Sequence, residues 1–314
     1  MSTIAILHPT NLLGKELRET LDQRPDLGQD FRLLSTRDDE IGTLTEVGGA
    51  AALVGRYEPE KLQGARAVFL CGPVEDNRPV LAELPPGVPA ILCSYDATLE
   101  DGFPVVAGVN TDAGRGRQVL LSPHPAVVLL ANLLDALRGF SLDAAAATVI
   151  QPVSMRDDAG LEELFEQTRQ IVAMTKRTPT PVFGTQLAFN VLPAALPADP
   201  LAASVGAVLP GLPPLALQVL QGAIFHSVSA SLYVRVSGEA DAKAVRKALT
   251  GHVHMEAAGR PRLLGPVDSA ASDKVLFGGV RKDEATGGFW LWAVMDNLTR
   301  GGALNALEIA AELT

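Results

Sequence analysis

The sequence predicts an α/β protein in which a doubly wound parallel-sheet domain is followed by a second, α+β domain. Short, continuous apolar runs near the N-terminus, such as Ile4–Leu7, are typical of strands buried on both faces of a parallel sheet. These runs alternate with stretches of helical periodicity, as in doubly wound folds. Further along the chain, Ser227–Val236 alternates apolar and polar residues, which indicates a half-buried antiparallel strand.

The first half of the chain contains the strands of the parallel sheet. A polar turn, His8-Pro9-Thr10-Asn11, follows the first strand, and leucines at helical spacing then predict a helix over 12–21. Ligands of such sheets bind at the carboxyl ends of the strands. The expected strands are Ile4–Leu7, Phe31–Ser35, Ala67–Cys71, Ala90–Cys93, Val105–Val106 and Val119–Leu121.

The second half mixes strands and helices. A charged helix follows the strand Ala144–Ile150, and the Pro-rich region 179–214 is apolar enough to be a folded connection. The helix over 241–249 is expected to turn Ala244, Val245 and Ala248 inward. The chain ends with a strand at Phe289–Met295 and a helix over 302–313. The buried face of the charged helix is predicted to be Leu161, Leu164, Phe165, Thr168, Ile171 and Val172.

Composition excludes several classes of protein. The 314 residues suffice for two domains, at about 150 residues each. With 26 Lys and Arg against 36 Asp and Glu, the net charge of −10 argues against a nucleic-acid partner. No apolar run reaches the ~18 residues of a membrane helix, and the N-terminus has no features of a signal peptide. Two cysteines make neither a disulfide framework nor a metal cluster, so we expect a cytoplasmic protein without a metal.

The first strand, turn and helix resemble a Rossmann dinucleotide-binding unit with an incomplete fingerprint. Gly14 is retained, but His8 and Asn11 stand where small residues would let a pyrophosphate approach. A turn without any ligand is therefore the simpler interpretation. After the second strand, Ser35 and Arg37 suit the 2′-phosphate of NADP, whereas the acidic run 38–40 beside them would repel it.

Several motifs spread over the whole chain resemble the aspartate-semialdehyde dehydrogenase family. They are Pro104–Asn110, Ala188–Pro193, Lys274–Arg281, Leu291–Leu298 and Arg300–Ala306. The resemblance implies a Rossmann-like domain rejoined by the last helix, and a second domain whose sheet builds a homodimer. It also implies a cysteine thiolate that attacks an aldehyde, hydride transfer to NADP, and cleavage of the thioester by phosphate.

The chain departs from this family at the reacting groups. The nucleophile's position in the family turn is Pro125, which no chemistry can make nucleophilic. Gln151 matches the glutamine that positions the substrate, and His226 matches the general base. The arginine that clamps the carboxylate should precede that histidine by seven positions. If His226 is the base, Val219 takes the arginine's place; alternatively, Gln221 takes it and the histidine is lost.

Other residues could replace the missing nucleophile or form a metal site. The family's phosphate-binding arginine corresponds to Leu99, so a second anion site is lost as well. Cys71 and Cys93 end strands and are better interpreted as small buried apolar residues. Ser122 and His124 could form a hydroxyl–imidazole pair, but nothing in the sequence orients the imidazole. His252 and His254, near Glu256, fit a metal site less well than a solvated surface pair.

The residues left for a cofactor are few. We expect NADP, if it binds, at Thr10, Gly14, Ser35, Arg37, Cys71, Gly72 and Asn305. The glycines beside Asn305 fit close packing of the last helix equally well. The predicted domain limits are 1–125 with 296–314 for the nucleotide-binding type, and 126–295 for the substrate and dimerisation domain.

Two functions follow from these residues. The first is a non-catalytic or regulatory homodimer, with an interface formed by Ser227–Val236, Leu187–Val191 and Trp290–Val294 and with room for a small-molecule ligand. The alternative is an NAD(P)-dependent oxidoreductase with a different, less anionic aldehyde substrate, which Gln151, His226 and Asn305 would serve. A heteromeric partner of a true dehydrogenase shares the structural expectations of the first function.

Overall fold

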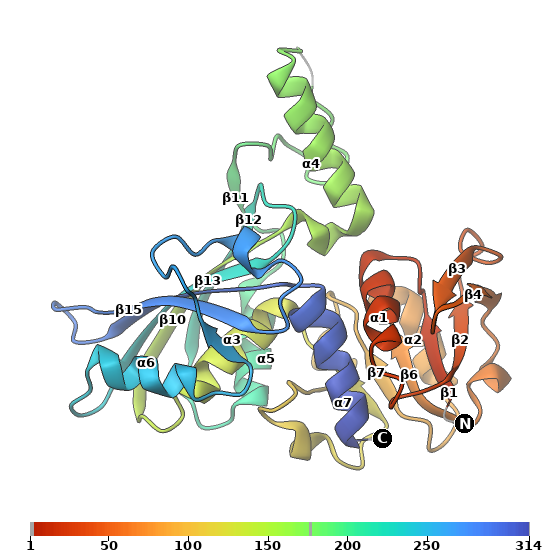
Figure 1. Cartoon of the computed structure of the whole chain (residues 1–314), viewed down its shortest axis with the longest axis horizontal. Helices are drawn as coiled ribbons and strands as arrows, with labels where there is room; N and C mark the ends of the chain where they lie inside the picture. Colours follow the sequence, from red (N-terminus) through yellow and green to blue (C-terminus); the bar gives the residue numbers. More distant parts are fainter. Residues whose placement is uncertain (1–2, 176–177, 314) are drawn as a thin grey trace. The chain divides into compact units, whose positions relative to one another are not determined.

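The computed structural model describes residues 3–175 and 178–313, and the chain divides into two compact units (Figure 1). Unit 1 takes in the chain up to residue 128, residues 207–209 and the chain from residue 298. Unit 2 takes in residues 129–206 and 210–297. The last helix therefore belongs to the same unit as the first strand. The predicted domain limits stay a prediction.

Unit 1 is built on a seven-stranded parallel sheet, which confirms the predicted fold class. The strand order is β5-β2-β1-β6-β7-β9-β8. The chain runs from β1 outward in both directions, so the topological switch point lies between β1 and β6, where ligands of doubly wound sheets bind. The strands are β1 (Thr3–Leu7), β2 (Asp30–Ser35), β5 (Gly55–Arg56), β6 (Ala65–Leu70), β7 (Ala90–Leu92), β8 (Phe103–Pro104) and β9 (Val119–Leu121).

Apolar clusters pack on both faces of this sheet, which is why its strands are continuous apolar runs. One cluster joins Ile4, Ile6 and Phe69 to Leu17 of helix α1 and Ile309 of helix α7. A π-helical turn at Thr299–Leu304 precedes α7 and packs against α1. The remaining elements of unit 1 are α1 (Leu12–Asp22), α2 (Val74–Ala82), α7 (Asn305–Leu313), and the hairpin of β3 (Leu44–Val47) with β4 (Ala50–Leu53).

Unit 2 is built on a seven-stranded mixed sheet. The strand order is β11-β12-β10-β13-β16-β15-β14, and β10, β13 and β16 form its antiparallel centre. The strand predicted from alternation, β13, buries Val228, Ala230, Leu232 and Val234 as expected. The strands are β10 (Leu142–Gln151), β11 (Val191–Pro193), β12 (Leu215–Gly222), β13 (Val228–Val236), β14 (Met255–Ala257), β15 (Val275–Lys282) and β16 (Phe289–Met295).

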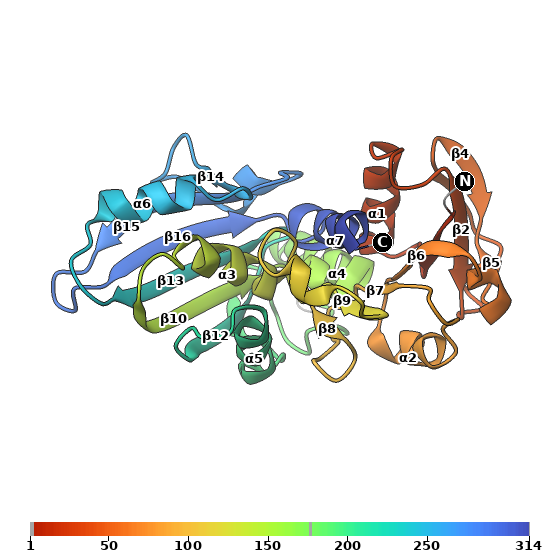
Figure 2. The ribbon, with the colours of Figure 1, turned by 90° about the horizontal axis from the view of Figure 1, so that it is seen from below.

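The two faces of the mixed sheet differ in their cover. Helices α3 (Pro125–Ala136), α5 (Ala198–Val208) and α6 (Ala242–Thr250) lie on one face, as Figure 2 shows. On the opposite face, cross-strand neighbours Thr148, Ser231 and Trp292 are only half-buried, as is Tyr233, and Trp290 is 37% exposed. We call this face, defined by these five residues, the open face of the sheet.

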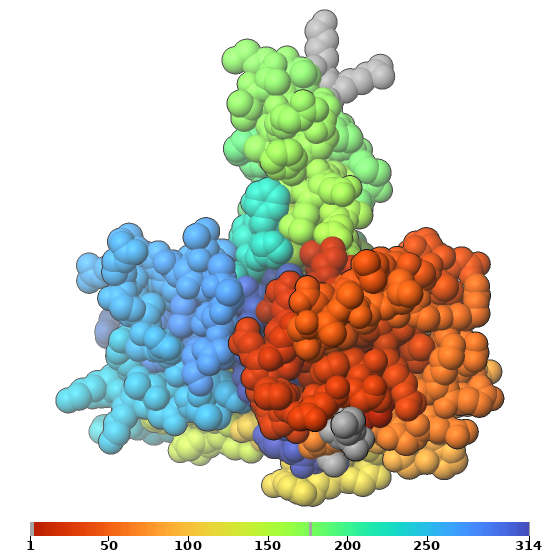
Figure 3. Space-filling model, turned by 45° about the vertical axis from the view of Figure 1, so that its right-hand side comes forward, coloured from red at the N-terminus to blue at the C-terminus, as the bar shows by residue number. Residues whose placement is uncertain are grey.

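Helix α4 (Asp157–Val172) turns inward a face that matches the predicted one only in part: Leu164 is buried as expected, and Leu161 and Ile171 pack beside it. It projects from unit 2 together with the segment that follows it (Figure 3). Phe165 is 63% and Val172 is 72% exposed, although the apolar periodicity predicts both to be buried. Glu163 and Gln167 are buried in their place. That part of the prediction was wrong because the partner of this helix face is a loop that presents backbone polar groups, which a carboxylate and an amide satisfy better than apolar side chains.

Hydrogen bonds from Gln167 hold this loop. Its Oε1 accepts from the backbone N–H of Leu187 at 2.7 Å and of Ala188 at 2.9 Å, and its Nε2 donates to the Pro179 carbonyl at 2.9 Å. Replacing Gln167 with Leu should destabilise the packing of α4 with this loop by about 2–4 kcal/mol, because two buried N–H groups lose their acceptor. Hydrogen exchange at residues 187 and 188 and urea unfolding measure the effect. The same change at Gln170, on the outer side of α4, should have little effect.

Smaller differences from the predictions concern the bounds of two elements and the buried face of α6. The strand predicted at Val105–Val106 was placed two residues too late, since β8 covers Phe103–Pro104. Of the residues predicted to turn inward from α6, Val245 is buried, Ala248 is half-buried and Ala244 is exposed, while Leu249 is buried as well. The helix predicted over 302–313 begins as the π-helical turn and becomes α-helical at Asn305. Within the described residues, no helix combines the length and the apolar character needed to cross a bilayer.

Candidate functional site

The turn between β1 and α1 is held together by its own side chains. Asn11 caps α1, and its Oδ1 accepts from the backbone N–H of Gly14 at 2.7 Å. A Cβ on Gly14 would lie 2.7 Å from the carbonyl carbon and oxygen of Pro9, so glycine is required for the helix to approach the turn. One of the N-terminal amides that a Rossmann unit offers to a phosphate, that of Gly14, is therefore already bonded to Asn11.

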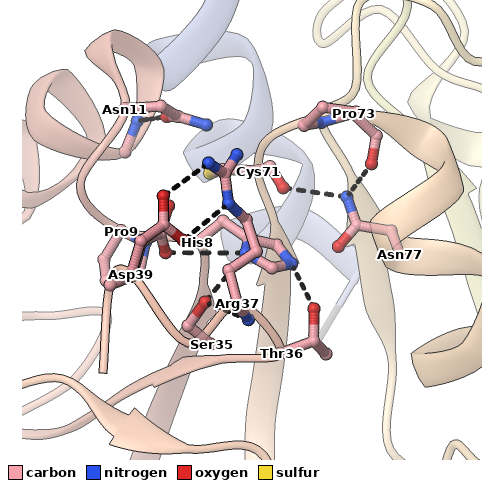
Figure 4. A network of polar contacts seen from close by, with 12 residues as sticks. His8, Pro9, Asn11, Ser35, Thr36, Arg37, Asp39, Cys71, Pro73 and Asn77 are labelled. Atoms are coloured by element: carbon pink, nitrogen blue, oxygen red, sulfur yellow. Dashed lines mark hydrogen bonds and ion pairs between the residues drawn. The ribbon is translucent and has the colours of Figure 1, made fainter.

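His8 fills the space between the ends of β1 and β2 (Figure 4). Its side chain is 1% exposed, and its backbone has φ of 54°, a left-handed conformation that favours glycine. The ring lies between two residues that follow or end β2. Its Nδ1 is 3.1 Å from Ser35 Oγ, and its Nε2 is 3.4 Å from Thr36 Oγ1. Ser35, predicted to receive the 2′-phosphate of NADP, thus bonds an imidazole of the same chain.

The acidic run after β2 engages the groups that would otherwise attract a phosphate. Asp39 forms a two-pronged ion pair with Arg37, at 2.8 and 3.2 Å, and Asp38 pairs with Arg56 at 2.6 Å. The carboxylate of Glu40 lies 3.5 Å from His8 Nδ1 and is largely buried. Burial raises the pKa of this carboxyl, but hydrogen bonds from His8, Ser35 and Thr10 outweigh burial and hold the pKa below its ordinary value.

The turn after β6 closes on the first turn. Gly72 has φ of 82°, and a Cβ there would lie 3.3 Å from the Cβ of His8 and 3.5 Å from Asn11 Nδ2. Asn77 fixes this turn by donating to the carbonyl oxygen of Cys71 at 2.8 Å (Figure 4). The switch point between β1 and β6 is thus filled by side-chain contact where the backbone of a dinucleotide passes in Rossmann folds.

The two cysteines lie in the core of unit 1. Cys71 and Cys93 follow the neighbouring strands β6 and β7 and belong to the same apolar cluster. A hydrogen bond with the Cys71 thiol, together with burial, raises the pKa of Cys93 well above its ordinary value. A nucleophilic cysteine needs the opposite shift, so Cys93 has the environment of a structural thiol.

Asn305, at the start of α7, uses its amide inside unit 1. Its Nδ2 donates to Ser122 Oγ at 2.8 Å and its Oδ1 accepts from the backbone N–H of Ala107 at 2.9 Å. Ser122 therefore bonds an amide, and His124 Nδ1 accepts from the backbone N–H of Ala126 at 3.1 Å. Both residues contribute to the turn at which Pro125 begins α3.

Gln151 and Gln221 meet at the ends of parallel strands in unit 2. The register of β10 and β12 places them directly opposite each other, and Gln151 Nε2 donates to Gln221 Oε1 at 2.9 Å. Both are buried, and Gln151 Oε1 has no hydrogen-bond donor among the described residues. Of the two candidates for the arginine's place, Gln221 is the neighbour of Gln151 in the register. Val219 lies two residues before it on the same strand.

His226 lies in the loop between β12 and β13 and is half-buried. The next residue, Ser227, is buried and has φ of 78°, a strained conformation for a residue with a Cβ. Asn297 holds this conformation, because its Oδ1 accepts from the Ser227 backbone N–H at 2.9 Å while its Nδ2 donates to Ser154 Oγ at 3.1 Å. No hydrogen bond joins the His226 ring to another described residue.

His252 and His254 are not the solvated surface pair that the sequence indicates. The side chain of His252 is 7% exposed and lies 3.3 Å from Asp135, and His254 is buried 3.3 Å from Asn132 Oδ1. Both precede β14 and pack toward helix α3 rather than lying on a strand. In the described ranges, no group of three or more His, Cys, Asp and Glu side chains could hold a metal ion.

Comparisons with known proteins agree with this architecture. No protein-family model matches the sequence. The chain is 24% identical over 336 aligned residues to an aspartate-semialdehyde dehydrogenase of Bacillus subtilis, which covers 99% of this chain and 96% of that protein. It is 29% identical over 330 residues to a USG-1 protein homolog of Azotobacter vinelandii, covering 98% and 96%.

A solved structure of a probable aspartate-semialdehyde dehydrogenase from Pseudomonas aeruginosa superposes with a TM-score of 0.90 at 22% identity, covering 99% of this chain and 98% of that one. The fold, a parallel-sheet unit completed by the last helix and a mixed-sheet unit, is that of the aspartate-semialdehyde dehydrogenases. Three sequence relatives that align over nearly their whole length, at 24–29% identity, are likewise an aspartate-semialdehyde dehydrogenase and two USG-1 protein homologs.

Sequence reasoning missed three groups around the candidate sites. Glu40 was seen only as a repelling charge, and its bond to His8 joins segments that are 32 positions apart. Asn77 and Asn297 carried no signal, because a lone asparagine outside a turn does not reveal its partners. Only the polar character of the acidic run after β2 pointed to this site.

Proposed function

We propose that this protein is a non-catalytic member of the aspartate-semialdehyde dehydrogenase family that acts as a homodimer through binding rather than hydride transfer. The observation that carries the proposal is the turn that opens α3. The residue that the family resemblance aligns with the nucleophilic cysteine is Pro125, the first residue of that helix. A proline ring has no atom that can form and release a thioester-like intermediate.

The substrate groups support the same conclusion. Gln151 bonds Gln221, so two neutral amides meet at the position where the family clamps a carboxylate with arginine. An amide cannot replace the charge and the two parallel N–H donors of a guanidinium. An anionic semialdehyde would therefore lose its main attraction to unit 2.

The residues present do not fit NADP. His8 and Asn11 lie against the turn after β6, and Arg37 and Ser35 are engaged with Asp39 and His8. Each of these side chains would have to move before a dinucleotide could lie across the switch point. No step through NADP is assigned to this chain.

The test is an assay of the purified protein with aspartate semialdehyde, phosphate and NADP, read as NADPH absorbance. We expect no formation above the protein-free rate. The matched variant Pro125→Cys should also stay inactive, because one thiol restores neither the clamp nor the cofactor turn; labelling with iodoacetamide would report whether that thiol is reachable. Turnover of about 1 s⁻¹ or faster by the wild type, within the usual range of enzymes, would contradict the proposal.

A second candidate, an oxidoreductase with a less anionic substrate, is favoured by two observations. The backbone of Ser227, beside His226, is strained, and the buried Gln151 Oε1 has no hydrogen-bond donor among the described residues. Backbone strain concentrates at functional sites. Calorimetric titration of the wild type with NAD and with NADP separates the candidates, since heat from either cofactor favours the oxidoreductase and its absence removes it.

A further inference from the structure

Three groups near the switch point of unit 1 that could attract anions are bonded within the chain. The backbone N–H of Gly14, in the first turn of α1, donates to Asn11, and Arg37 pairs with Asp39. The backbone N–H of Val74, at the start of α2, donates to the carboxylate of Asp96 at 3.0 Å. Helix N-termini and a guanidinium in this place are the usual phosphate ligands of doubly wound folds. The chain thus supplies its own acceptors where a nucleotide would supply phosphate oxygens.

Glu40 is the most enclosed of these acceptors. It is 8% exposed, whereas Asp38 and Asp39 have side chains that are 84% and 66% exposed. Its Oε2 lies 3.5 Å from His8 Nδ1, and this buried oxygen has no hydrogen bond of ordinary length to a described residue. Burial raises the pKa of the carboxyl, but the ring of His8 and the hydroxyls of Ser35 and Thr10 nevertheless lower it, and they are donors that a phosphate group would also use.

We propose that the carboxylate of Glu40 occupies a phosphate-binding position between the β1–α1 turn and the end of β2, so that unit 1 contains a latent phosphate site closed by its own side chain. The inference rests on the proposed function in one respect, since both require that the wild type does not hold NADP. Glu40 excludes phosphate by charge, because two anions cannot share one desolvated site. His8 excludes a dinucleotide by volume, through its contact with the turn at Gly72.

The charge of Glu40 and the volume of His8 can be tested separately by substitution. Glu40→Ala removes the anion and leaves the donors of Ser35 and Thr10, so inorganic phosphate and pyrophosphate should bind at least ~10-fold more tightly than to the wild type. His8→Gly removes the ring at a position whose φ of 54° suits glycine. The double variant, His8→Gly with Glu40→Ala, should bind NADP or NAD with a Kd at least ~10-fold below that of His8→Gly alone.

Calorimetry and thermal shift measure these affinities. Asp38→Asn is the matched control. It removes the same charge two residues before Glu40, and Asp38 pairs with Arg56 rather than with a residue of the site. This variant should bind phosphate no better than the wild type. A gain for NADP alone assigns Glu40 to the 2′-phosphate position, and equal gains for NAD assign it to the pyrophosphate position. Either result supports the latent site.

The inference is overturned if folded Glu40→Ala and the double variant bind phosphate and dinucleotides no more tightly than the wild type. It is also overturned if the wild type binds NADP as tightly as the double variant. If Glu40→Ala does not fold, Glu40→Gln removes the charge with the same shape and must itself gain phosphate affinity. Dehydrogenase turnover by the wild type would defeat the proposed function, whereas these binding gains test Glu40 alone.

Discussion

Replacing Glu308 with Leu should lower the free energy of unfolding of the protein by about 3–5 kcal/mol, the usual cost of leaving a buried charge unpaired. The charge is that of Arg300, in the π-helical turn before α7, with a side chain only 2% exposed. Its Nη1 and Nη2 donate to the two carboxylate oxygens of Glu308 at 2.9 and 2.6 Å. Within the described chain, Arg300 Nε has no acceptor, so this carboxylate is the main compensation for the guanidinium.

Urea unfolding followed by circular dichroism measures the loss. The double variant Arg300→Met and Glu308→Leu should regain most of the stability, because apolar side chains of similar volume remove the unpaired charge. The exposed pair of Glu166 with Arg169 provides the contrast. Its hydrogen bonds lower the pKa of Glu166 to about 2, yet Glu166→Leu should change stability little, since solvent screens both charges. A loss below about 1 kcal/mol for Glu308→Leu would show that water reaches Arg300.

The sequence could predict some parts of the fold, whereas others, including this ion pair, could not be predicted from it. Strands of the parallel sheet were predictable, because burial on both faces makes them continuous apolar runs that few other elements share. The face of α4 was not, because the partner of Glu163 is the backbone of a loop 19 residues away, at Val182. The contact of Arg300 with Glu308 likewise depends on a π-helical turn, which side-chain periodicity does not reveal.

The sequence could likewise predict only part of the candidate site. The resemblance and the order of strands located the turn after β1 and the groups after β2, which the structure brings together around His8. The sequence could also flag that an acidic run opposes phosphate. It could not show that Glu40 lies against His8, or that Gln221 rather than Val219 is opposite Gln151. Those facts depend on register and on contacts between distant segments, where local patterns carry no information.

The open face of the mixed sheet carries the second large prediction, that Trp290→Asp dissociates the proposed homodimer. On this face Trp290 packs against Tyr233, with ring centroids 5.2 Å apart, and is 37% exposed. Half-buried aromatic side chains on a sheet face without covering helices are typical anchors of a protein interface. In a two-fold symmetric dimer the substitution occurs twice, so we expect the dimer Kd to rise by at least ~100-fold.

Light scattering during size exclusion, over a range of concentrations, measures this Kd. The matched control is Val253→Asp, which places the same charge on a side chain that is 62% exposed and should leave the dimer intact, because its neighbours His252 and His254 pack toward α3 on the covered face of the sheet. If Trp290→Asp proves unstable, Ser231→Arg tests the same face, because Ser231 lies between Thr148 and Trp292 in the register and a long cation there blocks face-to-face packing. A wild type that stays monomeric, or folded variants that dimerise as well as the control, would contradict a dimer formed through the open face.

The predicted contribution of Leu187–Val191 to the interface can be tested separately. Phe189 is 71% exposed, so Phe189→Asp should weaken the dimer only if that segment also contacts the partner.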